Sequence, residues 1–296
     1  MNLLLLFPDI ALIAIGFVLS RKVDWGSDLW SGIEKLTYYV LFPALLFHAL
    51  VRNPVQWGLA RDLVVGVVLV VAVAALASSL AGILLRPPAL RLASSSQCAY
   101  RFNSYVAMAL SLRLGGTEGL ALCALCLGVA VPVVNLLAVS SLARHTRAGL
   151  MTEWLRNPLI LATVAGLLAA WAGLRLPEPA DELLSRVGAA ALGLGLMSVG
   201  AGIRISGVSG NHALVAWLTA VKLLLAPAVA LTAGAWLGLE PTAHTVLVIF
   251  GAVPTASAAY ILANRMGGDG PFVALCIAVS TFTAVLTLPF WLSVIV

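Results

Sequence analysis

The sequence predicts an all-α polytopic membrane protein of about ten transmembrane helices, and three observations lead to this class. Hydrophobic residues make up 61% of the 296 residues, charged residues make up 10%, and the mean hydropathy is +1.06. A soluble domain is nearer half apolar and a quarter charged. The apolar residues recur in runs about as long as a bilayer is thick. These runs also lack the alternation of apolar and polar residues that a membrane β-barrel needs.

The charge pattern and the cysteines point away from nucleic-acid, metal and cofactor chemistry. The net charge is +5, but the basic residues lie mostly between apolar runs, which is how charge sets membrane topology. No Lys/Arg cluster is long enough to suggest a nucleic-acid partner. All four cysteines lie in apolar runs, and the CxxC of Cys123 and Cys126 lacks the further ligands that metal sites usually have nearby. We therefore expect no metal, no cofactor and no nucleic acid.

The apolar runs follow one another with short joints. Arg21 and Lys22 follow the first run rather than precede it, and no small-x-small cleavage site is present, so we expect a retained helix with its N-terminus outside. Gly, Pro and charged residues mark most joints, such as RPPALR at 86–91 and LPEPADE at 176–182. The expected spans are 3–20, 30–50, 62–85, 92–113, 118–142, 157–174, 183–203, 212–238, 243–265 and 271–296.

Lys and Arg in the joints predict the orientation. The odd-numbered joints hold eleven of these residues and the even-numbered joints five. The odd joints should therefore face the cytoplasm. The expectation is a multi-pass protein of the plasma membrane, the inner membrane of a bacterium, with both termini outside the cytoplasm.

The two halves of the chain repeat each other at an offset near 150. Gly16 in the first span matches Gly166 in the sixth. RLGGTEG at 113–119 closes the fourth span as RMGGDG at 265–270 closes the ninth. Five helices per repeat is an odd number, so the second repeat enters from the opposite face and the repeat is inverted, as in many secondary transporters. The predicted parts are a first repeat at 1–142, a short cytoplasmic connection at 143–156 and a second repeat at 157–296.

Polar residues interrupt the expected fourth helix. The stretch SSSQCAYRFNSYVAMALSLRLGG at 94–116 places Arg101 about 15 Å from a helix start near residue 92. An arginine at the bilayer centre costs about 2.5–3.5 kcal/mol on insertion scales, and such residues usually face a partner or a water-filled cavity. The alternative is a later helix start, which makes Arg101 an interfacial anchor whose head reaches water.

The expected ninth helix contains GAVPTAS at 251–257. Pro254 removes a backbone donor and clashes with the preceding turn. Freed backbone groups cost several kcal/mol each in hydrocarbon and are tolerated where they line a cavity or meet a partner. The break is therefore either a binding site or a structural proline kink.

Two further polar residues lie inside apolar spans. Lys222 is the only lysine deep in a span. It could neutralise carbonyl-rich helix ends, attract an anion, exchange a proton or reach out to the interface. Asn135, one turn after Pro132, either contacts substrate or holds two helices together. The expected structural or hinge positions are Pro43, Pro132, Pro227 and Gly251.

Six stretches together match the pattern of a known family: LTYYVLFPALLF at 36–47, RFNSYVAMAL at 101–110, VPVVN at 131–135, NPLILATVAGLL at 157–168, VKLLLAP at 221–227 and VPTASAAYILA at 253–263. Together they resemble the auxin efflux carrier family, which includes plant PIN proteins and bacterial malonate or malate permeases. The resemblance implies a five-plus-five inverted repeat similar to sodium/proton antiporter and bile-acid symporter folds. Its fourth and ninth helices unwind and cross, and helices 1, 2, 6 and 7 support a moving domain of helices 3–5 and 8–10. Many relatives have a proline in the fourth-helix break, which SYVAMAL here lacks.

Carried onto this chain, the family crossing falls at Asn103–Tyr105 and Pro254–Ser257. Cationic groups and half-helix N-termini suit an anionic substrate, and no Asp or Glu is expected deep in a span. The predicted substrate-binding residues are Arg101, Asn103, Ser104, Tyr105, Asn135, Lys222, Pro254, Thr255 and Ser257.

The predicted function is secondary active transport of small organic anions, such as malonate, malate or auxin-like acids, by alternating access. Proton or sodium coupling stays open, although the lack of deep carboxylates argues against a carboxylate-based sodium site. The alternative is an anion channel or a non-transporting sensor of the same fold. An intramembrane enzyme is not supported, because the sequence has no HExxH, no deep Asp pair and no GxSxG. The expected partners are the carboxylate substrate and membrane lipid. A second copy of the chain, in a homodimer, is the one protein partner considered.

Overall fold

The computed structural model describes residues 7–23, 28–143, 158–203 and 211–295, and every regular element in these ranges is helical. The expected all-α class is confirmed. The predicted connection at 143–156 lies outside the described residues, apart from Ala143 at the end of a helix. The elements are α1 (Phe7–Lys22), α2 (Asp28–Leu36), η2 (Thr37–Leu41), α3 (Phe42–Arg52), α4 (Trp57–Leu84), α5 (Ala89–Ser95), η3 (Ser96–Ala99), α6 (Ser104–Ala143), α7 (Pro158–Trp171), α8 (Glu178–Gly202), α9 (His212–Ala220), η4 (Val221–Leu225), α10 (Ala226–Trp236), α11 (Pro241–Ala252), α12 (Ala258–Arg265) and α13 (Gly270–Ile295).

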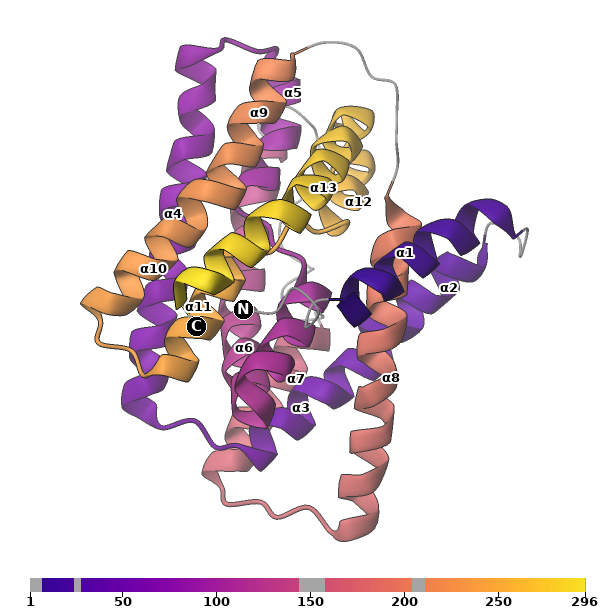
Figure 1. Ribbon diagram of the computed structural model, residues 1–296, viewed down its shortest axis with the longest axis vertical. Helices are drawn as coiled ribbons and strands as arrows, with labels where there is room; N and C mark the ends of the chain where they lie inside the picture. The colour runs from indigo at the N-terminus through magenta and orange to yellow at the C-terminus, as the bar shows by residue number, and fades with distance from the viewer. Residues whose placement is uncertain (1–6, 24–27, 144–157, 204–210, 296) are drawn as a thin grey trace.

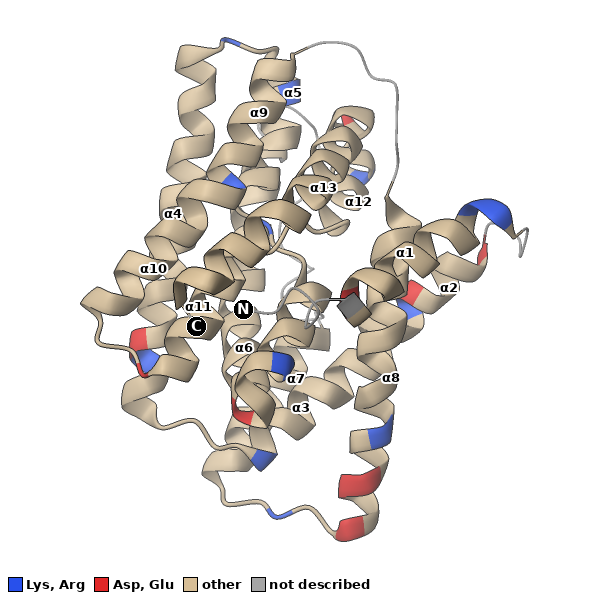
Figure 2. Ribbon diagram, viewed as in Figure 1, with Lys and Arg blue, Asp and Glu red and all other residues tan. Residues whose placement is uncertain are grey.

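The helices have the length and surface of a membrane protein. Large apolar side chains are widely exposed, and the charged residues gather mainly near helix ends (Figure 2). Such an exposed apolar surface is expected where lipid, rather than water, is the solvent. Within the described ranges, five helical runs are long and apolar enough to cross a membrane, namely Trp57–Leu84, Ala89–Leu142, Glu178–Gly202, His212–Trp236 and Gly270–Ile295.

The long helix α6 reverses direction at Gly116. This residue has φ 61° and ψ −154°, a conformation that glycine adopts without steric cost. Beyond it, Gly119 packs directly against the backbone carbonyl of Ser111. In a straight helix these two residues would be about 12 Å apart. The two arms of α6 therefore run back along each other, with the reversal at the joint expected between the fourth and fifth spans.

Two π-helical turns lie directly before prolines. η2 (Thr37–Leu41) ends two residues before Pro43, and η4 (Val221–Leu225) ends two residues before Pro227. In each, the residue that precedes the proline donates its N–H to the carbonyl five residues earlier. A proline deprives the carbonyl four residues before it of a donor, and a widened turn is a common response. Two of the expected hinge prolines thus adjoin locally widened helix.

The carbonyl that Pro227 deprives of its donor is satisfied by a side chain from a distant helix. The carbonyl of Leu223, which Pro227 leaves without its normal donor, accepts a 2.8 Å hydrogen bond from the indole N–H of Trp291 in α13. Gly251 packs on the same region, since a Cβ there would lie 2.9 Å from the Cα of Pro227. The Pro227 site is therefore tightly packed. Pro132 lies inside the second arm of α6.

Glycines bring α1 onto α8 and α7 onto α3. A Cβ on Gly16 would overlap the backbone of Met197, and a Cβ on Gly166 would lie 3.3 Å from the Cα of Phe47. Figure 1 shows α1, α2 and α8 on one side of the molecule and α4, α9 and α10 on the other, with α6 and α11 between them. The two interrupted segments thus lie in the middle of the helical assembly.

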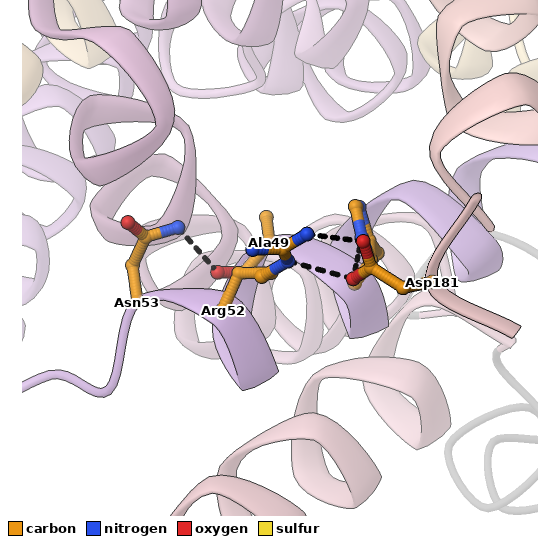
Figure 3. A network of polar contacts seen from close by, with 5 residues as sticks. Ala49, Arg52, Asn53 and Asp181 are labelled. Carbon is orange, nitrogen blue, oxygen red and sulfur yellow. Dashed lines mark hydrogen bonds and ion pairs between the residues drawn. The ribbon is translucent and has the colours of Figure 1, made fainter. Parts of the chain in front are cut away.

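A polar network joins the end of α3 to the first turns of α8 (Figure 3). Arg52 Nε donates to Asp181 Oδ1 at 2.6 Å, and Arg52 Nη2 also contacts Asp181 Oδ2. His48 Nε2 lies 2.8 Å from the same carboxylate. Asn53 Nδ2 donates to the carbonyl of Ala49 at 3.0 Å and caps α3. A bidentate guanidinium–carboxylate contact fixes geometry as well as charge, so α3 and α8 are tied at this end.

Candidate functional site

The first break lies between η3 and α6. Regular structure stops at Ala99, and α6 begins at Ser104. Asn103 Oδ1 accepts hydrogen bonds from the backbone N–H groups of Tyr105 at 3.1 Å and Val106 at 3.3 Å. This is an N-cap, which satisfies the free donors at a helix start. The break therefore lies slightly earlier than the expected Asn103–Tyr105, because the cap draws Ser104 and Tyr105 into the first turn of α6.

The second break contains the expected proline. α11 ends at Ala252 and α12 begins at Ala258, so the residues Val253–Ser257 are non-helical. Pro254 cannot donate to the carbonyl four residues earlier. The helix therefore stops just before it, as the sequence predicts.

The two breaks satisfy each other's backbone groups. The N–H of Asn103 donates to the carbonyl of Pro254 at 2.8 Å. Thr255 Oγ1 donates to the carbonyl of Cys98 at 2.6 Å, and the N–H of Thr255 donates to Ser280 Oγ at 3.3 Å. A backbone group without a partner would cost several kcal/mol in hydrocarbon. These cross-links explain how the first break persists without a proline.

Lys222 takes the place of the donors that the second break removes. Its side chain is 2% exposed, and Nζ donates to the carbonyls of Gly251 at 2.8 Å and Phe250 at 3.5 Å. In a continuous helix these carbonyls would accept from residues 254 and 255. Pro254 has no N–H, and Thr255 donates elsewhere. Of the roles open from the sequence, this geometry favours neutralisation of a helix C-terminus.

Arg101 is buried inside the protein next to the first break. It is 6% exposed, and its Nη2 donates to Asn135 Oδ1 at 2.7 Å. Asn135 lies half-buried on the second arm of α6. This position argues against the interfacial anchor, because a side chain that reaches out to headgroups would be exposed. Arg101 and Asn135 are thus brought together.

Three predicted residues border the breaks with half-buried side chains: Ser104, Tyr105 and Ser257. Ser257 lies close to the end of α8, where a Cβ on Gly202 would be 3.3 Å from Ser257 Oγ. Tyr105 contacts the start of α3, as described below. The predicted residues therefore gather around the breaks, with Lys222 on the α11 side and Asn135 on the α6 side.

Two residues of the site were not among those predicted. Gln97 is fully buried, and its Nε2 donates to the carbonyls of Ser94 at 2.9 Å and Ala259 at 3.3 Å, so it links η3 to α12. Ser280 accepts from the second break. Their signal in the sequence is a polar residue in an apolar run, which is too common to single them out. Among the described residues no group of three or more His, Cys, Asp or Glu side chains could hold a metal.

The charges at the breaks favour a negatively charged ligand. α6 and α12 both begin at the breaks, and a helix N-terminus carries partial positive charge. Arg101 adds a full positive charge beside them. Lys222 meanwhile offsets the carbonyl end of α11. The arrangement can hold an anion through charge-assisted hydrogen bonds.

Removing the Asn103 cap should destabilise the protein. We expect Asn103→Ala to lower the free energy of unfolding by about 0.5–2 kcal/mol, because two N–H groups at the start of α6 lose their acceptor. Asn103→Ser keeps a capping oxygen and should lose less. Thermal unfolding of both variants in detergent measures the difference, and equal melting temperatures would contradict the cap.

Comparison with known proteins gives two matches. The sequence model of a family described as "Membrane transport protein" matches residues 140–292. A protein of Rhizobium meliloti (strain 1021), named "Putative malonate transporter", is 24% identical over 308 residues, which cover 96% of this chain and 92% of that protein. The family match and the apolar helices agree in describing an integral membrane protein.

Proposed function

Because the chain belongs to the auxin efflux carrier family of membrane transport proteins, we propose that it is a secondary transporter that carries small organic anions by alternating access. Transport, rather than enzyme catalysis, is the activity that this membership indicates. The substrate class is our proposal, and malonate is the first candidate because a relative with this name matches almost the whole chain.

The observation that carries the proposal is the mutual satisfaction of the two breaks beside a buried arginine. Asn103 and Pro254 share a backbone hydrogen bond, and Arg101 lies buried next to it. Non-helical backbone at membrane depth is found where it is buried in protein or lines a cavity. Discontinuous helices whose N-termini face an anion are typical of transporter binding sites.

Two matched helix contacts support an inverted repeat. Gly16 packs on Met197, and Gly166 packs on Phe47. Adding 150 to Gly16 and Phe47 gives Gly166 and Met197, so the two contacts are the same pair with the halves exchanged. We propose the five-plus-five repeat of residues 1–142 and 157–296 on this basis, together with the offset of the two breaks.

In the proposed mechanism, α1, α2, α3, α7 and α8 form the scaffold, and the remaining helices move. The two breaks travel together, because each holds the other's backbone. The anion binds to Arg101 beside the partial positive charge at the starts of α6 and α12, and the motion then exposes it to the other side. Binding to a site that faces one side at a time is what separates a carrier from a channel.

The test is uptake of radiolabelled malonate, malate and indole-acetate into proteoliposomes. We expect saturable uptake of at least one of them, with counterflow: unlabelled substrate inside should accelerate entry of the label. Empty liposomes and the variant Arg186→Gln, which alters an arginine whose side chain is 77% exposed, serve as controls. Uptake with and without a proton or sodium gradient identifies the coupling ion.

Other outcomes would replace the proposal. An ion flux per protein far above the turnover of a carrier, measured as single-channel conductance and without counterflow, would identify an anion channel. Ligand-induced thermal stabilisation without any flux would identify a sensor. If the protein neither transports nor binds any carboxylate, the proposed substrate class is wrong.

A further inference from the structure

An aromatic contact joins the first break to the scaffold. Tyr105, in the first turn of α6, stacks on Phe42 at the start of α3, with ring centroids 4.6 Å apart and an interplanar angle of 18°. Phe42 is 1% exposed, whereas Tyr105 is half-buried. A buried ring with full packing is held in one position. One face of Tyr105 is therefore covered by a fixed partner.

The edge of the same ring rests on the backbone of α8. A Cβ on Gly195 would lie 2.8 Å from Tyr105 Cδ1 and 3.2 Å from Phe42 Cζ. The 2.8 Å distance is shorter than real Cβ contacts, and 3.2 Å is tighter than most of them, so any larger residue at 195 would push one of the rings away. Because Phe42 is enclosed on its other sides, the half-buried Tyr105 is the ring that would move.

We propose that Phe42 and Gly195 are specificity-determining residues that fix Tyr105 as a rigid wall of the substrate site in this conformation, before α6 moves, and that they restrict transport to small non-aromatic carboxylates. An aromatic acid would need either a free ring face for stacking or space that a mobile Tyr105 would vacate. Phe42 occupies one face of the Tyr105 ring, and the clamp between Phe42 and Gly195 keeps Tyr105 from vacating space beside its other face. This inference rests on the proposed function, because it assigns the size limit of the same site.

The matched control lies on the same helix. Gly193 has nothing within 4 Å of the position that a Cβ would take, so Gly193→Ala adds the same methyl group to α8 without touching Tyr105. Phe42→Leu keeps an apolar side chain at the start of α3 but removes the stacked ring. It is preferred to Phe42→Ala, which would leave a larger cavity and endanger folding.

The experiment measures the uptake of malonate, malate and indole-acetate by wild type, Gly195→Ala, Gly193→Ala and Phe42→Leu, together with ligand-induced thermal stabilisation. We expect wild type to prefer malonate over indole-acetate. Phe42→Leu should raise the indole-acetate to malonate ratio about 10-fold. Gly195→Ala should lower malate uptake more than malonate uptake, and Gly193→Ala should match wild type.

Each result decides one point. If wild type prefers indole-acetate, or if Gly195→Ala and Phe42→Leu keep the wild-type ratios while transport persists, the inference is overturned and the proposed function stands. If wild type neither transports nor binds any carboxylate, the proposed function fails and the size limit fails with it. The inference is supported if uptake and ligand-induced thermal stabilisation both give the expected ratios between the carboxylates for each variant.

Discussion

Lys222→Met is expected to stop transport and to lower the melting temperature. Methionine has a similar length but no donor, so the carbonyls of Gly251 and Phe250 lose the hydrogen bonds that replace those removed by the second break. Each unsatisfied buried acceptor costs about 1–3 kcal/mol. The variant also no longer buries an ammonium group, which offsets part of this loss. We therefore expect a net destabilisation of about 1–3 kcal/mol.

The effect on transport should be larger than the effect on stability. Without the ammonium, the partial negative charge at the end of α11 faces the site unopposed, and we expect uptake to fall by at least about 100-fold. Leu224→Met is the control, since Leu224 lies in the same π-helical turn but is 52% exposed. It should behave as wild type in both assays.

A double-mutant cycle tests the physical reason. Pro254→Ala restores an N–H that can donate to the carbonyl of Phe250. Lys222→Met should then destabilise the Pro254→Ala protein less than it destabilises wild type. If Lys222→Met costs the same in both backgrounds, Lys222 does not act by replacing the lost backbone donors.

Arg101→Gln is expected to weaken substrate binding by about 10- to 100-fold, because hydrogen bonds to charged groups contribute about 1.5–3 kcal/mol each. Glutamine keeps an amide donor for Asn135 but removes the positive charge, so it separates the packing role from the electrostatic one. Arg101→Lys keeps the charge without the planar pair of donors and should retain part of the affinity. Ligand-induced thermal stabilisation and uptake at several concentrations measure the change.

Asn135 provides the companion measurement. Asn135→Ala removes the acceptor of the 2.7 Å hydrogen bond from Arg101 and should reduce affinity less than Arg101→Gln, because the cation stays. The exposed-arginine variant Arg186→Gln should bind as wild type does. If Arg101→Gln also binds with wild-type affinity, the buried guanidinium does not contact the anion.

The sequence alone predicts much of the fold, because the responsible forces are local. Runs of apolar residues with the length of a bilayer require helices, since only hydrogen bonds within the segment satisfy the backbone in lipid. Pro254 predicts the second break, because a residue without an N–H interrupts any helix. Gly115 and Gly116 in RLGGTEG predict the joint at which α6 reverses, where glycine tolerates a positive φ. The cations Arg101 and Lys222 are also visible as charges within apolar runs.

Only the tertiary structure assigns the partners. The sequence indicates that Pro254 leaves a carbonyl without a donor, but the replacement is Lys222, which lies 28 residues before Phe250. The first break has no proline, and its backbone is held by Thr255, 157 residues beyond Cys98. Likewise, only the structure shows that the ring of Tyr105 packs against Gly195 and leaves no space for a side chain there. Helix breaks follow from the chemistry of single residues, whereas the groups that satisfy them are set by which distant helices pack together, and no local pattern encodes that choice.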